Sequence, residues 1–276
     1  MIEVIFNADD FGISKGVNAA IYQAHTQGIL NSTSLMINQD FAADAVNMAK
    51  QLPDLKVGLH INLTNQKPAC DAKDIPLLTD DKGQFKNGFV KLFILAFLHP
   101  KKLQQQSYTE IKAQIEKYLK TGLKLEHLDS HRHVHLIPPI FKAVKRLAAE
   151  YNVKHIRVMN ENIINTIRQN KSKSYLFDGG IIKYFLLRFL SAWNTTEKET
   201  YFYTILFTCK ISKEQFKNIK LPKGYKRVEV MIHPSVTAID KQNPAGIWDQ
   251  NVLSDWRTTE LETLMDKTVL DGIGQQ

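Results

Sequence analysis

Residues 2–12 read IEVIFNADDFG, an apolar run that ends in two adjacent carboxylates. A helical pattern follows at residues 16–27, where Val17, Ala20 and Ile21 recur on one face. A strand followed directly by an amphipathic helix is the first half of a β-α-β unit. The opening of the chain therefore predicts an α/β fold built on parallel strands.

The same alternation continues along the chain. Further strand-like runs are STSLMIN ending near Asn38, LKVGLHINL from Leu55, KLEHLDSHRHVHL, VKHIRVM, TYFYTILF and RVEVMIHP. Helical patterns lie at residues 41–51, 108–120, 138–151, 178–193 and 254–269. Seven strands joined by crossovers predict a TIM-like (β/α) barrel, complete or incomplete, with a flat doubly wound sheet as the alternative. No glycine-rich nucleotide signature follows any strand, so no dinucleotide or nucleoside-triphosphate site is predicted.

The length of the chain fits one barrel domain covering residues 1–276. A long irregular segment from Thr64 to about Gln106 follows the third strand, and part of it is apolar enough for a short helix. Loops of that length inside a compact domain are often active-site lids. We therefore predict a long loop insertion after the third strand, of the kind that often forms an active-site lid.

Charge and cysteine content argue against several classes of protein. The net charge is +8, but the lysines are scattered and form no basic helix, so we predict a solvated surface and no nucleic-acid partner. A weak attraction to anionic partners stays open. Cys70 and Cys209 are far apart, and the first residues lack a signal-peptide pattern, which together predict free thiols and a cytoplasmic protein.

Two strongly apolar runs stand out, FVKLFILAFL at residues 89–98 and GGIIKYFLLRFL at residues 179–190. Each is too short to cross a membrane and carries a charge, so no membrane partner is predicted. We expect buried or lid-like helices. A homodimer surface is the alternative.

Polar residues gather at the ends of the predicted strands. They are Asp9 and Asp10 after the first strand, His60 in the third, Asp129 and His131 in the fourth, Arg157 in the fifth and His233 after the last. In a parallel α/β barrel the carboxyl ends of all strands open on one face, which carries the active site. We therefore predict one reaction centre built from these residues.

The pair Asp9 and Asp10 is the first part of that centre. Two adjacent carboxylates are costly to crowd together unless a cation or hydrogen bonds hold them. If the chain stays extended, their side chains point to opposite sides, so that one can be a ligand and the other a base. A helix N-cap is the alternative for Asp10.

The segment HLDSHRHVH, residues 127–135, is the most specific part of the sequence. Its five polar alternate residues would share one face of an extended strand, at spacings of about 6.5 to 7 Å. Not all of them can reach one ion, so one is predicted as a ligand and its neighbours as supports or pocket lining. The alternative is a solvated or helix-capping histidine cluster. For His60, the alternative is a packed core histidine.

Two histidines and one carboxylate suit Zn²⁺, Fe²⁺ or Mn²⁺ and leave coordination positions open for water. Open positions favour a catalytic over a structural metal.

Taken together, NADDFG, GLHINLT, HLDSHRHVHLIP and the late IHPS resemble the YdjC-like carbohydrate deacetylases, which include the chitooligosaccharide deacetylases. The motifs occur in family order with similar spacing, so the resemblance covers nearly the whole chain. It implies a TIM-like barrel that hydrolyses N-acetyl groups of amino sugars with a divalent metal, Mg²⁺ or Zn²⁺. By motif, Asp10, His60 and His131 would hold the metal, Asp9 would be the general base and His233 the general acid.

Asp129, His133 and Arg157 are predicted to contact the substrate, a small carbohydrate. Two other functions stay open. One is a metal-dependent phosphoesterase or another hydrolase, and the other is a non-catalytic sugar-binding protein on the same fold.

Overall fold

The computed structural model describes residues 2–169, 179–195, 199–208, 210–216, 224–244 and 247–270, so Cys209 lies outside the described residues. The strands are β1 (Glu3–Phe11), β2 (Ser32–Leu35), β3 (Lys56–Ile61), β4 (Leu128–Ser130), β5 (Thr200–Tyr203) and β6 (Arg227–Ile232). The α-helices are α1 (Lys15–Gln27), α2 (Ala42–Lys50), α3 (Phe89–Leu98), α4 (Pro100–Leu119), α5 (Pro138–Glu150), α6 (Ile163–Gln169), α7 (Gly180–Asn194), α8 (Thr237–Asp240) and α9 (Asp255–Met265). Short 3₁₀ segments are η1 (Ala72–Asp74), η2 (His131–Leu136), η4 (Lys213–Gln215) and η6 (Gln250–Leu253).

The strands follow the order β4-β3-β2-β1-β6-β5 in a 6-stranded sheet. The pairs β1–β6, β3–β4 and β5–β6 are parallel, which confirms the predicted α/β fold. The predicted fifth strand, VKHIRVM, is wrong as a strand. Only an isolated bridge between Ile156 and Leu128 forms there. Since β4 is extended over three residues, the chain beside it has little to pair with.

Packing divides the chain into two compact units, each described here by itself. The first unit comprises residues 1–9, 14–33 and 158–276, and the second comprises residues 10–13 and 34–157. The single domain over residues 1–276 stays a prediction.

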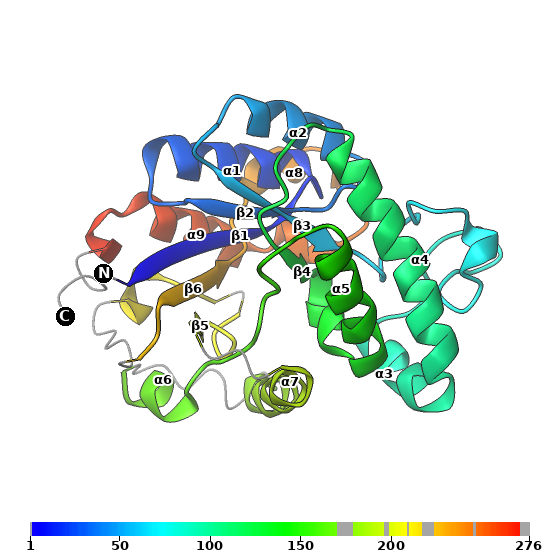
Figure 1. Ribbon diagram of the computed structural model, residues 1–276. Helices are drawn as coiled ribbons and strands as arrows, with labels where there is room; N and C mark the ends of the chain where they lie inside the picture. Colours follow the sequence, from blue (N-terminus) through cyan, green and yellow to red (C-terminus); the bar gives the residue numbers. More distant parts are fainter. Residues whose placement is uncertain are drawn as a thin grey trace. The chain divides into compact units, whose positions relative to one another are not determined.

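In the first unit, β6 lies between β1 and β5, as Figure 1 shows. Helix α1 buries its predicted apolar face and packs against α8 and α9. Ser14 caps this helix by accepting a hydrogen bond from the backbone N–H of Val17. Asp240 accepts from the Ser14 hydroxyl at 2.7 Å and from the backbone N–H of Gly16 at 3.0 Å, which ties the start of α1 to the end of α8.

In the second unit, α4 packs along α5 (Figure 1). The prediction that the helix begins at Tyr108 is wrong, because α4 already begins at Pro100. Proline is favoured in the first turn of a helix, where its missing N–H leaves no donor unsatisfied. The insertion after β3 therefore contains two helices, α3 and the first part of α4, and is less irregular than predicted.

The two apolar runs form α3 and α7, but neither is a buried helix. In α3 only Leu92 is buried, while Val90 is 71% and Phe97 72% exposed. In α7 one face is buried and the other exposes Ile182 and Trp193. Among the described residues, no helix is both long and apolar enough to span a membrane.

Candidate functional site

At the end of β1 the backbone leaves the extended conformation. Asp10 has φ 69°, in the left-handed region that non-glycine residues seldom adopt. The expectation of an extended chain through both aspartates is therefore wrong at Asp10. Such backbone costs on the order of 1–3 kcal/mol and is found mainly at functional sites. The carbonyl of Asp10 accepts from the N–H of Ile13 at 3.0 Å, which closes the turn.

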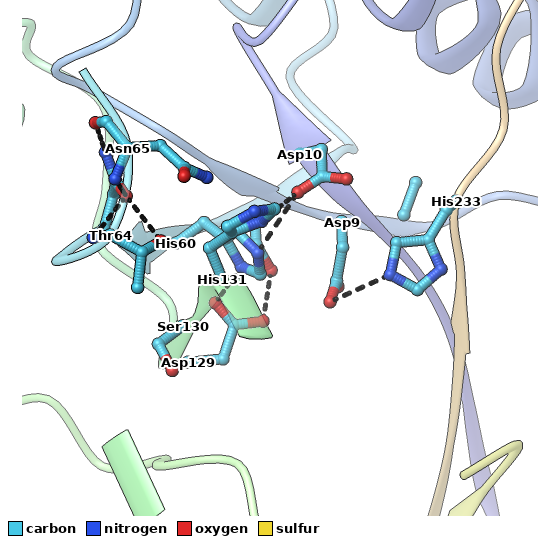
Figure 2. A network of polar contacts seen from close by, with 12 residues as sticks. Asp9, Asp10, His60, Thr64, Asn65, Asp129, Ser130, His131 and His233 are labelled. Carbon is cyan, nitrogen blue, oxygen red and sulfur yellow. Dashed lines mark hydrogen bonds and ion pairs between the residues drawn. The ribbon is translucent and has the colours of Figure 1, made fainter. Parts of the chain in front are cut away.

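The second unit brings Asp10, His60 and His131 together, as predicted from their strand ends. His131 Nδ1 lies 2.8 Å from Asp10 Oδ1, and His60 Nε2 lies 3.5 Å from the same oxygen (Figure 2). One ligand atom from each residue lies within 4.8 Å of the others, and all three side chains are buried. This arrangement could hold a metal ion.

A buried carboxylate orients His60. Asp129 Oδ1 lies 2.8 Å from His60 Nδ1, so that Nε2 is the nitrogen turned toward Asp10 (Figure 2). The other oxygen accepts from the Ser34 hydroxyl at 2.7 Å and from the Arg157 guanidinium at 2.8 Å. Although burial alone would raise it, the pKa of Asp129 lies well below its usual value because Arg157 and His60 stabilise the charge. The carboxylate–histidine pair is the usual support of a metal-binding histidine.

The histidine-rich segment does not form one extended strand. It leaves β4 at Ser130 and turns through η2, where Arg132 and His133 have φ 56° and 55°. The predicted common face for its alternate residues is therefore wrong, because two left-handed residues reverse the chain after His131. Ser34 is in β2, and its Oγ lies 3.0 Å from Nε2 of His127.

His135 supports the turn from within. Its Nδ1 lies 2.6 Å from Ser130 Oγ, and its Nε2 lies 3.1 Å from the carbonyl oxygen of Arg157. Burial lowers the pKa of His135 to about 4, so its ring is neutral near pH 7. A neutral ring can donate one hydrogen bond and accept one, which matches these two contacts.

The first unit holds the other two predicted catalytic residues. His233 Nε2 lies 3.8 Å from Asp9 Oδ2 (Figure 2), and the side chain of Asn7 donates to Asp9 Oδ1 at 2.8 Å. The backbone N–H of His233 donates to Glu260 at 2.6 Å. Burial raises the pKa of Glu260 to about 7.

Sequence reasoning assigned no role to Ser34, Asn7 or Glu260. Serine and asparagine in strands carry no distinctive signal, and Glu260 lies in a helix of ordinary composition. The roles of His133 and Arg157 as substrate contacts stay predictions. In the structure His133 is 7% exposed, and Arg157 is fully buried against Asp129.

Comparison with known proteins identifies a family and several relatives to which this chain is similar. The family described as YdjC-like protein matches residues 3–274. A carbohydrate deacetylase from Clostridium beijerinckii is 30% identical over 100% of this chain and 96% of its own length. A carbohydrate deacetylase from Brevibacillus brevis is 42% identical over 55% of this chain. That match covers 58% of the Brevibacillus protein, so the similar part is little more than half of that relative.

A solved structure from Enterococcus faecalis, described as a candidate cellobiose-phosphate cleavage protein, has the same fold. It aligns with a TM-score of 0.69 over 99% of this chain and 94% of its own. At 24% identity the likeness concerns the fold alone.

Proposed function

The chain belongs to the YdjC-like protein family, and from this premise we propose that it is a metal-dependent carbohydrate deacetylase. Its substrate would be a small carbohydrate that carries an N-acetylated amino sugar, and the products would be acetate and the free amine. The names of the Clostridium and Brevibacillus relatives support the reaction class. The cluster of Asp10, His60 and His131 is the observation that carries the proposal.

The donor set of this cluster fits a divalent cation. A carboxylate and two imidazoles leave further coordination positions for water and substrate. Imidazole ligands favour Zn²⁺ over Mg²⁺, which prefers oxygen ligands and retained water. The buried Asp129 beneath His60 fits a metal site too, because it fixes which ring nitrogen turns toward Asp10. We therefore propose Zn²⁺ before Mg²⁺.

When bound, the ion would acidify a water molecule and polarise the amide carbonyl. Asp9 directly precedes Asp10, so the two α-carbons are about 3.8 Å apart across one peptide bond. We assign to Asp9 the role of general base that accepts the proton of the attacking water. Asn7 holds one of its oxygens by a hydrogen bond, which limits the orientations of the carboxylate.

The departing amine needs a proton because it is a poor leaving group. His233 faces Asp9 and can supply that proton as an imidazolium. Its backbone N–H is anchored by Glu260, and Pro234 restricts the chain that follows. These contacts support the assignment of His233 as general acid.

Acetate release tests the proposal directly. The purified protein would be stripped with a chelator, reloaded separately with Zn²⁺, Mn²⁺ or Mg²⁺, and incubated with N-acetylglucosamine and its short oligomers. We expect no acetate from metal-free protein and restored release after reloading. His60→Ala and His131→Ala should lose the bound metal by elemental analysis.

His99→Ala is the matched control, because His99 is exposed at the start of α4, outside the cluster. It should keep both metal and activity. Full activity in protein confirmed to be metal-free would refute the metal-dependent mechanism. Hydrolysis of a phosphate ester without acetate release would favour the phosphoesterase, and sugar binding without turnover would favour a sugar-binding protein.

A further inference from the structure

The loop after β3 carries a buried amide donor. Asn65 is 7% exposed, and within the described part of the chain its side-chain Nδ2 has no hydrogen-bond partner. Figure 2 shows this carboxamide extending from its loop toward the side on which His60 and Asp10 lie. Burying an amide N–H without an acceptor is unfavourable, so such groups in folded proteins call for an explanation.

The backbone of Asn65 is held firmly from both sides. The side chain of Asn62 donates to the carbonyl of Asn65 at 2.7 Å and accepts from its N–H at 3.1 Å. Asn62 is itself fixed by Gln114 of α4, which accepts from the backbone N–H of Asn62 at 3.1 Å and donates to its carbonyl at 2.6 Å. The backbone that carries the Asn65 side chain is therefore positioned before any ligand arrives.

Glu110 completes this support one turn earlier on α4. It accepts from Gln114 at 2.7 Å and from the backbone N–H groups of Ala69 and Cys70 at 2.8 and 3.0 Å. The loop is thus attached to α4 at two points, on either side of Asn65. A loop fixed in this way is suited to present one side chain in one orientation.

We propose that Asn65 is a further catalytic residue, which donates a hydrogen bond from Nδ2 to the oxygen of the substrate's acyl group. The inference rests on the proposed deacetylase function, which puts the reacting amide beside Asp10 and His60. Nδ2 can only donate, so its partner must be an acceptor, and the acyl oxygen gains negative charge during hydrolysis. A preorganised donor aimed at that oxygen stabilises the transition state more than the bound substrate.

Kinetics with Asn65→Leu test this role, since leucine has a similar volume and no donor. We expect kcat to fall by about 10² to 10³, as for the loss of one oxyanion donor, with KM changed less than about threefold. Bound metal per chain should stay at the wild-type value. Asn65→Ala, which only deletes atoms, repeats the measurement if leucine disturbs the fold.

Gln66→Asn is the matched control from the same loop. Gln66 is partly exposed, has φ 58° and donates to Asp40, and asparagine tolerates that backbone conformation. This variant should keep the wild-type kcat. An unchanged kcat in Asn65→Leu, with or without a rise in KM, would overturn the proposal. Either result would show that the donor does not act on the reacting oxygen.

A binding measurement keeps the inference separate from the proposed function. If wild-type protein releases no acetate from any sugar tested, the deacetylase proposal fails by itself. Titration of metal-loaded protein with acetate ion then decides on Asn65, because acetate offers an acceptor oxygen without chemistry. We expect Asn65→Leu to bind acetate roughly tenfold more weakly, and equal affinity in the two proteins would overturn the inference.

Discussion

Replacing Asp129 with asparagine perturbs a buried carboxylate that contacts one candidate metal ligand, His60. Asparagine keeps the shape of the side chain but loses the charge and places an amide N–H where an oxygen stood. One oxygen of Asp129 faces His60, and the other faces Ser34 and Arg157, so the new donor meets another donor in either orientation. Both the orientation of His60 and the partner of Arg157 are affected.

Two magnitudes follow from these contacts. Loss of the carboxylate behind a metal-binding histidine typically lowers metal affinity about 10- to 100-fold. The Arg157–Asp129 pair is fully buried at 2.8 Å, and removing one partner of such a pair costs about 3–5 kcal/mol. We therefore expect Asp129→Asn to weaken Zn²⁺ binding about 10- to 100-fold. We also expect it to lower the unfolding free energy of the metal-free protein by about 3–5 kcal/mol.

The pH dependence has a definite sign. The pKa of Asp129 is lowered in the folded protein, so its contribution to stability is present above the unfolded pKa and lost as the pH falls through the folded value. The difference in unfolding free energy between wild type and variant should be constant from about pH 5 to 8 and narrow only in acid.

Urea unfolding of metal-free protein and competition with a chromophoric Zn²⁺ chelator measure the two effects. Asp71→Asn is the matched control, because Asp71 is exposed and its carboxylate pairs with Lys73 at the surface. It should leave both quantities unchanged. A loss below about 1 kcal/mol together with wild-type Zn²⁺ affinity in Asp129→Asn would refute this reasoning.

Three further changes test separate parts of the molecule. Asp9→Asn should keep the bound metal but lower turnover by about 10² to 10⁴, and loss of metal here with retention in Asp10→Asn would mean that the two roles are reversed. His233→Ala should slow amide hydrolysis more than ester hydrolysis, because an alcohol leaving group needs less protonation. An equal fall in the two rates would indicate that His233 positions the substrate and does not donate the proton. Burial raises the pKa of Glu161 to about 7, so its stabilising contribution is present in acid and is lost as the pH rises from about 4.5 to 7. Glu161→Gln should therefore flatten the fall in melting temperature between pH 5 and 8, and parallel curves for the two proteins would contradict the buried, protonated state.

The strands, the helix faces and the grouping of the candidate ligands were predictable where the local sequence pattern agrees with the chain topology. The opening strand, the face of α1 and the strand around His60 follow from apolar periodicity, which needs no knowledge of neighbours. That Asp10, His60 and His131 meet also followed, because the ends of parallel strands gather at one edge. The grouping itself thus required only the type and order of the elements.

Other features depend on contacts that no local pattern contains. Arg157 follows a run of strand-forming residues, yet its side chain is buried against Asp129 and its segment forms only one bridge. Asn65 lies in a loop with no distinctive sequence pattern, and its backbone is held by Asn62 and, through Asn62, by Gln114 in α4. Such residues can be recognised only once the distant partner is placed.

The alternating histidines show why a regular pattern can mislead. In an extended strand, alternate residues would form a row with steps of about 6.5 to 7 Å, so that at most one or two could serve one ion. The turn at η2 instead gives the members of the row separate partners, with His131 against Asp10 and His135 against Ser130. His127 stays before the turn, and its ring lies where a β-carbon on Gly58 would come within 2.4 Å. The alternation of His127, His131 and His135 in the sequence therefore reflects three different sets of contacts. The effect of substituting one of these histidines should be interpreted from the contacts of that histidine and not from the alternating pattern.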